Sequence, residues 1–246
     1  MLTIAILSLA SLAYYLGLTS VDYFFKGGDP PGKWFGDAAK VLGLTGIIEK
    51  EDLSKIFRGF HPRTDEPLVQ NADEKSGRRK RRPAWDLTFS APKTASCMIT
   101  TKLWSSVRTL HDEAVHKTME FLQKTRAVTR VGSVSKGDWR FELAMIMAAL
   151  FEHSVSRELD PQLHTHALLA NMCVTEDGEF RSLHSPPFFG NRQRHFLGAY
   201  YRAQFAYDLR TELKLETYRE GTSFDIRGIP EELVKFWSKR RIQIKK

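Results

Sequence analysis

The chain has 246 residues and a mass of 28.2 kDa, which fits one large domain or two small ones. Hydrophobic residues make up 42% and charged residues 27% of it, a composition that supports a packed core and excludes gross disorder. The formal net charge of +8 favours an anionic partner, either nucleic acid or a membrane surface.

The first 18 residues are largely apolar, and no charged side chain appears before Asp22. Such a run is typical of a membrane anchor or a signal peptide. This run has no basic residue ahead of it, however, and polar residues interrupt it repeatedly. We therefore predict no membrane insertion, and a short buried strand over residues 3–7.

A helix is predicted after this strand, because Ser8 is a good N-cap and leucines recur at helical spacing. The leucines that share one face are Leu9, Leu12 and Leu16. At about 100° per residue, Tyr14 points away from that face and Tyr15 lies at its edge.

Helices and a basic loop are expected in the next part of the chain. Short helices are predicted over residues 37–49, ending near Gly43, and over residues 51–57. Residues 58–82 are polar and poor in apolar side chains, which indicates a long loop. The loop ends in a basic run of Arg78, Arg79, Lys80, Arg81 and Arg82.

A strand over residues 84–89 follows the basic run. Its side chains alternate, so Trp85, Leu87 and Phe89 share one face and Asp86 lies on the other. Further on, the periodicity predicts an amphipathic helix over residues 101–125 and a strand over 126–134. Residues 141–150 are apolar nearly all round, which favours a buried helix.

The last third is predicted to contain a helix over residues 191–213 and a strand over 218–226. Residues 231–246 have the pattern of a basic helix, and the chain ends inside that pattern. We therefore expect the sequence to be part of a longer protein.

Three histidines, His153, His164 and His166, have a spacing that suggests a metal site. The period of two along a strand puts His164 and His166 on one face. If residues 158–161 form the loop of a hairpin, Arg157 pairs with Gln162 and His153 falls opposite His166, about 5 Å away. A register slip of one residue would separate them, and three unrelated histidines are the alternative.

Three segments resemble a known family. RPAWDLTFSAPK and HSVSRELDPQLHTHALLAN are similar to motifs of conjugative relaxase domains of the TraI/TrwC (MobF) type. AYYLGLTSVDYFFKGG resembles the tyrosine-pair segment that precedes them in that family. The segments occur in the family's order, and the resemblance spans nearly the whole chain.

The resemblance implies an HUH endonuclease, named for its histidine-hydrophobe-histidine motif. Its α+β fold would be an antiparallel sheet flanked by helices, with a C-terminal helical "fingers" region over the DNA cleft. Residues 1–246 would form one relaxase domain, with a catalytic palm over about 1–180 and a DNA-clamping region over about 181–246. Longer members of the family carry a helicase after this domain.

The implied function is metal-dependent nicking of one DNA strand at a plasmid transfer origin, through a covalent 5′-phosphotyrosine, which initiates conjugation. The implied nucleophile is Tyr14. The family's second tyrosine pair is Tyr23-Phe24 here, so only Tyr23 retains a hydroxyl for a further transfer. The metal triad falls on His153, His164 and His166, and the family's acidic residue falls on Asp86.

The residue types suit this chemistry. We expect one divalent ion, Mg²⁺ or Mn²⁺, although imidazole ligands also suit Zn²⁺ and Ni²⁺. The ion would neutralise the negative charge of the scissile phosphate. Asp86 would either receive the tyrosine proton or orient a metal-bound histidine.

Basic side chains would supply the contacts to single-stranded DNA. The expected DNA-binding residues are Arg78, Arg79, Lys80, Arg81, Arg82, Lys93, Arg157, Arg192, Arg194 and Arg202. A hairpin next to the nicked site, accessory proteins of the relaxosome and a coupling protein are further partners that the resemblance implies.

Three other functions remain open from the sequence. A rolling-circle replication initiator shares the chemistry but usually orders the motifs differently. A non-catalytic basic nucleic-acid-binding module with a structural metal has the same composition, and a membrane-anchored protein would use residues 1–18. The two cysteines, Cys97 and Cys173, lie in no metal or redox spacing, which agrees with a reducing compartment. The resemblance implies that this compartment is the bacterial cytoplasm.

Overall fold

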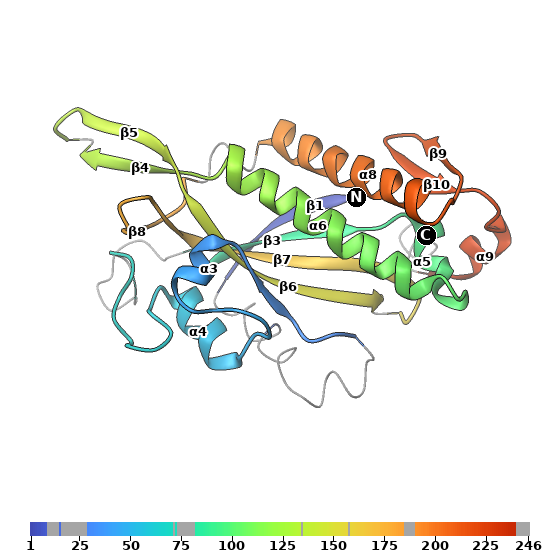
Figure 1. The fold of residues 1–246 in the computed structure, drawn as a ribbon, viewed down its shortest axis with the longest axis horizontal. Coiled ribbons are helices and arrows are strands. Elements are labelled where there is room, and N and C mark those ends of the chain that lie inside the picture. The colour runs from blue at the N-terminus through green and yellow to red at the C-terminus, as the bar shows by residue number, and fades with distance from the viewer. Residues whose placement is uncertain are drawn as a thin grey trace.

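The computed structural model describes residues 1–8, 15, 29–70, 72, 82–133, 135–156, 158–184 and 190–239. Its centre is a six-stranded sheet in the order β1-β3-β7-β6-β2, with β8 paired to β7 (Figure 1). Every pairing in it is antiparallel. The strands are β1 (Leu2–Leu7), β2 (Lys33–Phe35), β3 (Ala84–Ser90), β6 (Met145–Val155), β7 (Pro161–Val174) and β8 (Phe180–Arg181).

Two small hairpins and several helices complete the described fold. The hairpins pair β4 (Val128–Ser133) with β5 (Asp138–Leu143), and β9 (Thr217–Glu220) with β10 (Ser223–Ile226). The helices are α3 (Asp37–Val41), α4 (Lys50–Arg58), α5 (Lys93–Cys97), the 3-10 turn η1 (Met98–Thr100), α6 (Trp104–Thr125), α8 (Asn191–Glu212) and α9 (Glu231–Phe236).

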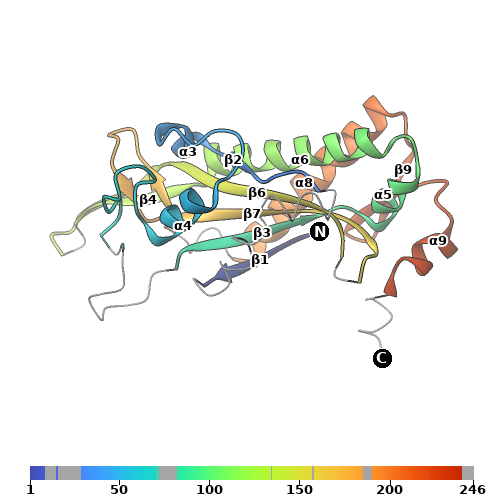
Figure 2. The ribbon, with the colours of Figure 1, turned by 90° about the horizontal axis from the view of Figure 1, so that it is seen from below.

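The central sheet separates two apolar clusters. On β7, Leu163, Ala167 and Leu169 join the cluster that contains α6 and α8. Leu168 and Ala170 join the other cluster, with side chains from α3 and α4. Figure 2 shows α6 and α8 lying along one face of the sheet. This α+β architecture confirms the predicted fold class, an antiparallel sheet flanked by helices.

The predicted helix over residues 141–150 is wrong. These residues belong to β5 and to β6, the long strand between β2 and β7. Residues 146–151 are buried on both faces of the sheet, so their side chains are apolar without alternation. A continuous apolar run of this kind occurs in doubly covered strands as well as in buried helices.

The predicted strand near the N-terminus is present as β1, but it is not buried along its length. Leu2 and Leu7 are buried, whereas Ile6 is exposed, because β1 is an edge strand of the sheet. Of the helix predicted after it, only Tyr15 lies within the described residues, in helical conformation. In the part of the chain that the structure covers, no helix combines the length and apolarity needed to cross a bilayer.

The helices predicted over residues 101–125 and 191–213 agree with α6 and α8 to within a few residues. The single strand predicted over 218–226 is instead a hairpin, because the chain turns at Gly221 and Thr222 between β9 and β10. The C-terminal helix is shorter than predicted, because α9 ends at Phe236. Residues 240–246 lie outside the described residues.

Candidate metal and tyrosine site

The two central strands β6 and β7 carry the three histidines. His153 on β6 pairs directly with His164 on β7, and Phe151 pairs with His166. The prediction that His153 lies opposite His166 is therefore wrong by two residues. A shift of two residues keeps every side chain on its face, so the predicted cluster survives the error.

The turn between these strands explains the shift. Val155 pairs with Pro161, after an irregularity in the ladder, so the loop comprises residues 156–160. Proline is tolerated at this position because it begins a strand. Ser156 closes the loop: its N–H donates to the carbonyl of Asp160, and its Oγ accepts the N–H of Asp160 at 3.2 Å. Leu159 adopts a left-handed φ of 59° within the loop.

The three imidazole rings lie close together. Their centroids are separated by 5.2 Å for His153 and His164, 5.6 Å for His153 and His166, and 5.1 Å for His164 and His166. A metal about 2.1 Å from one nitrogen of each ring would hold the centroids on the order of 5 Å apart. The ring spacing therefore fits a three-histidine site.

Each ring is oriented by an oxygen atom at Nδ1. Asp29 contacts Nδ1 of His153 at 3.3 Å, the carbonyl of Gln162 contacts Nδ1 of His164 at 2.8 Å, and Asp86 contacts Nδ1 of His166 at 2.8 Å. An acceptor at Nδ1 favours the tautomer with its proton there and its lone pair on Nε2. All three rings thus share the tautomer that can bind a cation through Nε2.

Asp29 is a member of the site that the sequence did not reveal. Its second oxygen accepts the backbone N–H of Ser154 at 2.9 Å, which ties the segment before β2 to the end of β6. Burial raises the pKa of the Asp29 carboxyl, but the hydrogen bonds from His153 and Ser154 outweigh it and lower the pKa from its ordinary value. An aspartate before two prolines resembles an ordinary loop residue, so only the fold identifies it.

The predicted acidic residue, Asp86, lies on β3 beside His166. Its carboxylate accepts hydrogen bonds from Nδ1 of His166, from the hydroxyl of Tyr15 at 2.7 Å and from Oγ1 of Thr88 at 3.1 Å. Burial raises the pKa of Asp86, but these three donors lower it overall. The carboxylate is therefore ionised and fully engaged.

His164 is neutral at ordinary pH. Burial lowers its pKa to about 4, and the nearby His166 and His153 rings act in the same direction. A neutral imidazole is the form that binds metals, so no proton has to be displaced from this ligand. Among the described residues, no group of three His, Cys, Asp or Glu side chains already has its donor atoms arranged to hold a metal ion, so the three neighbouring rings would have to shift to bind one.

Several predicted site residues lie outside the described residues. They are Tyr14, Tyr23, Arg78, Arg79, Lys80, Arg81 and Arg157. Of the basic run, only Arg82 is described: its side chain is exposed, and its carbonyl accepts the amide N–H of Asn171 at 2.9 Å.

The remaining predicted DNA contacts do not gather at the histidines. Lys93 is half-buried and donates to the carbonyl of Pro161 at 2.7 Å, and burial lowers its pKa. Arg192 and Arg194 lie on α8, which covers the face of the sheet opposite His164 and His166. Arg202 lies near the Met1 amino group, whose pKa is lowered to about 5 by burial and by this guanidinium.

A basic and aromatic hairpin, β4–β5, extends beyond the sheet in Figure 1. Trp139 and Phe141 are exposed on it and pack edge to face, with ring centroids 5.2 Å apart. Arg130 and Lys136 are exposed nearby. Sequence reasoning missed this surface, because the strands around residue 141 were predicted to be a helix.

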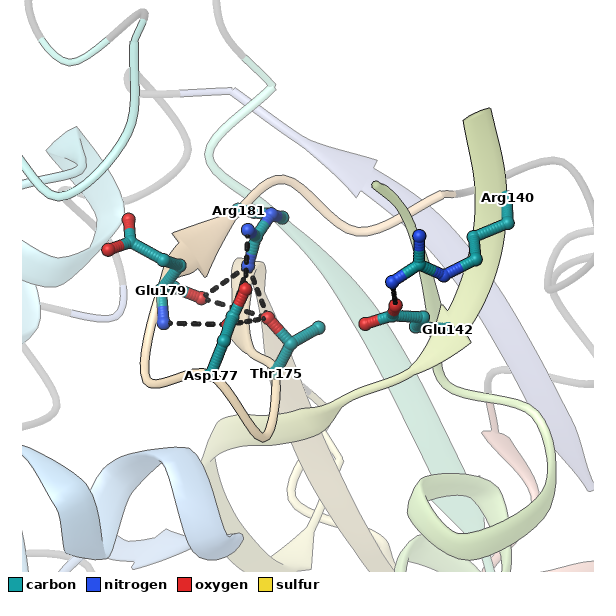
Figure 3. A network of polar contacts seen from close by, with 6 residues as sticks. All are labelled: Arg140, Glu142, Thr175, Asp177, Glu179 and Arg181. Atoms are coloured by element: carbon teal, nitrogen blue, oxygen red, sulfur yellow. Dashed lines mark hydrogen bonds and ion pairs between the residues drawn. The ribbon is translucent and has the colours of Figure 1, made fainter. Parts of the chain in front are cut away.

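Figure 3 shows the polar network beside this hairpin. Arg181 donates to both carboxylate oxygens of Asp177 across the β7–β8 turn, at 2.9 and 2.8 Å. On β5, Arg140 pairs with Glu142 at 2.5 Å. These two arginines already have carboxylate partners, so Arg130 and Lys136 are the better candidates for contacts to an anionic ligand.

Comparison with known proteins identifies relatives of the chain. The model of a family described as TrwC relaxase matches residues 10–246. The multifunctional conjugation protein TraI of Escherichia coli is 34% identical over 173 residues, which cover 68% of this chain and 9% of TraI. The TraI of strain K12 is 33% identical over the same length. The chain thus spans only a small part of these relatives.

Solved structures of conjugative relaxase TrwC superpose on the whole length of this chain. A conjugative relaxase TrwC in complex with oriT DNA, in a metal-free form, superposes with a TM-score of 0.85 at 29% identity, covering 100% of this chain and 82% of that one. A copper-bound TrwC–oriT complex gives 0.85 at 31% identity, with the same coverage. A TrwC complex with a 27-mer DNA comprising the recognition hairpin and the cleavage site gives 0.83 at 29% identity, covering 100% and 81%.

Proposed function

The chain belongs to the TrwC relaxase family, and we propose that it nicks one strand of a plasmid transfer origin and retains the 5′ end as a covalent phosphotyrosine. One observation carries the proposal beyond family membership. Three neighbouring imidazoles, on two paired strands, all have an oxygen acceptor at Nδ1. That arrangement suits a divalent cation next to a phosphodiester.

The donor set fits the expected metal. His153, His164 and His166 would hold one divalent ion, and the relatives include copper-bound and other metal-bound TrwC structures. Imidazole ligands favour Mn²⁺, Zn²⁺ or Ni²⁺ over Mg²⁺. When bound, the ion neutralises the charge of the scissile phosphate and orients it.

Tyr14 is the proposed nucleophile. Its oxygen would attack the phosphorus, form the tyrosine–phosphate bond and break the bond to the 3′ oxygen, which leaves as a hydroxyl group. Tyr14 is the neighbour in sequence of Tyr15, which contacts Asp86 and His166, and this adjacency in the chain supports Tyr14 as the nucleophile. Tyr23 is proposed to act in a second transfer.

Asp86 is proposed to orient His166 rather than to accept the proton of the nucleophile. Its carboxylate already accepts three hydrogen bonds, and its lowered pKa makes it a weak base. A carboxylate at Nδ1 of a metal-binding histidine fixes the ring and increases the basicity of Nε2.

The DNA would contact two basic surfaces. The run at residues 78–82 comes directly before β3, the strand that carries Asp86, and we propose that it and Arg157 bind the single strand. A TrwC relative was solved with DNA that includes a recognition hairpin. A two-stranded ribbon fits a major groove, so we propose that β4–β5 contacts the duplex of such a hairpin through Arg130 and Lys136.

The C-terminal part, from about residue 181, is proposed to close over the bound DNA. Its last described residue, Lys239, donates its backbone N–H to the buried carboxylate of Asp160 at 2.9 Å, in the turn between β6 and β7. This contact brings the C-terminal part to the end of the histidine hairpin. We also propose that the protein acts in the bacterial cytoplasm, with relaxosome accessory proteins and a coupling protein as its partners.

A denaturing gel tests this function. The chain is incubated with a labelled single-stranded oligonucleotide from the transfer origin of its own plasmid, with Mn²⁺ or with EDTA. We expect a shorter DNA product and a slowly migrating, protease-sensitive band, both only with the metal. Binding without cleavage in either condition would contradict the enzyme and favour a nucleic-acid-binding module.

A further inference from the structure

Tyr15 occupies a specific place in the site. Its side chain is buried, and its hydroxyl donates to Oδ2 of Asp86 at 2.7 Å and lies 3.3 Å from Nδ1 of His166. Its ring meets the His166 ring edge to face, with centroids 5.6 Å apart, and lies 6.1 Å from the ring of Phe151. The contacts of Tyr15 thus fix both its ring and its oxygen.

The side of His166 on which Tyr15 lies decides what Tyr15 can do. A cation would bind Nε2, whereas the Tyr15 oxygen is next to Nδ1, and these two nitrogens point in nearly opposite directions. An attacking oxygen must come within about 3–3.5 Å of the phosphorus of a phosphate held by that cation. Tyr15 lies behind the ligand ring, so its position suits support of the site and not attack.

We propose that Tyr15 is a positioning residue of the metal site, acting through Asp86. Its hydroxyl holds Oδ2 of Asp86 while Thr88 holds Oδ1, and the fixed carboxylate keeps the proton of His166 on Nδ1. His166 therefore presents its lone pair on Nε2. This inference rests on the proposed function only in that the three histidines bind a divalent ion.

The first test is the metal affinity of Tyr15→Phe, which keeps the ring and removes only the hydroxyl. Metal-stripped protein is titrated with Mn²⁺ by calorimetry and with Cu²⁺ by electron paramagnetic resonance. We expect the metal dissociation constant to rise about 10- to 100-fold, as for other residues that orient a metal ligand. The Mn²⁺ concentration for half-maximal nicking should rise in proportion, while the rate at saturating Mn²⁺ stays near that of the unmodified protein.

Tyr201→Phe is the matched control. Tyr201 is also a buried tyrosine with a bonded hydroxyl, but that hydroxyl contacts Nδ1 of His111, on the other face of the sheet. Its loss should lower the melting temperature without changing metal affinity. A metal affinity equally reduced in both variants would indicate general destabilisation and overturn the inference.

A double-mutant cycle tests the route through Asp86. If Tyr15 acts only by holding this carboxylate, Tyr15→Phe should have no further effect on metal affinity in an Asp86→Ala background. Additive effects of the two substitutions on metal affinity would contradict a route through Asp86. If Tyr15→Phe fails to fold, Thr88→Val tests the same carboxylate, because Thr88 donates to its other oxygen. An unchanged metal affinity of Tyr15→Phe, or a DNA adduct mapped to Tyr15, would refute the inference.

The two proposals can fail separately. If the unmodified protein forms no DNA adduct but Tyr15→Phe still weakens metal binding, the nicking function fails and the positioning role stands. If adducts form normally and metal affinity is insensitive to Tyr15, the positioning role fails and the nicking function stands.

Discussion

His153 and His164 are direct cross-strand partners, and their ring centroids lie 5.2 Å apart. Strand pairing alone brings them together, because His153 lies before and His164 after the same five-residue turn between β6 and β7. His166 is added two residues further along β7, on the same face. The fold therefore assembles the three rings before any cation binds.

The first prediction follows from this preassembly. Replacing His164 with Ala, or adding EDTA, should reduce DNA cleavage at least about 100-fold, because phosphate neutralisation contributes several kcal/mol. The circular dichroism spectrum should stay unchanged. His116→Ala is a control, since His116 is on α6 and pairs with Asp112 at 3.5 Å. Cleavage by His164→Ala at the normal rate would refute the metal site.

The second prediction concerns the nucleophile. Tyr14→Phe should abolish the covalent adduct, because phenylalanine retains the aromatic ring and lacks the attacking oxygen. Tyr23→Phe should leave the first nick largely intact and affect a later transfer. Peptide mapping of the protein–DNA adduct decides between the two tyrosines. If Tyr14→Phe still forms the adduct and the DNA is attached to Tyr23, then Tyr23 is the nucleophile and the prediction is wrong.

A third prediction concerns salt. With a net charge of +8 and the basic run at residues 78–82, DNA affinity should fall steeply as salt rises, by about 0.7 log units per tenfold change for each phosphate contact on single strands. Neutralising Arg78, Arg79 and Arg81 together should flatten the slope of log affinity against log salt by about two units. The same measurement on Arg192 and Arg194 variants tests whether α8 contacts the DNA, and a salt-independent affinity would indicate a different ligand.

The fourth prediction concerns His111 on α6, which is fully buried between Oγ1 of Thr165 at 2.9 Å and the hydroxyl of Tyr201 at 2.7 Å. Burial lowers its pKa to about 3 from 6.5. In the unfolded chain His111 takes up a proton below about pH 6.5, whereas in the fold it stays neutral to about pH 3. The stability from this group is thus complete above about pH 6.5 and is lost as the pH falls towards 3.

Urea unfolding at pH 7 and pH 5, in EDTA, measures this effect. The unmodified protein should lose about 2 kcal/mol more unfolding free energy than His111→Gln between these two values, since each pKa unit corresponds to about 1.4 kcal/mol. Both proteins retain His164, whose pKa is lowered to about 4, so its contribution cancels in the difference. An equal pH dependence of the two proteins would show that His111 is not the group responsible.

The sequence by itself determined which residues share a face. A period of two places Asp86 opposite Trp85 and Leu87 on β3, and it places His164 with His166 on β7, whatever strands lie beside them. It also determined the long helices α6 and α8, whose periodicity persists over many turns. These features depend on local geometry, which the order of residues is sufficient to specify.

The tertiary structure decided which faces meet. The apolar run before His153 forms a strand and not a helix because it lies between two other strands of the sheet. The register of His153 depended on hydrogen bonds inside the turn that follows it. Asp29 contacts His153 although the two residues are 124 positions apart in the chain. Tyr15 contacts Asp86 across 71 positions. Contacts at such separations arise from packing of the whole sheet, and no local pattern in the sequence encodes them.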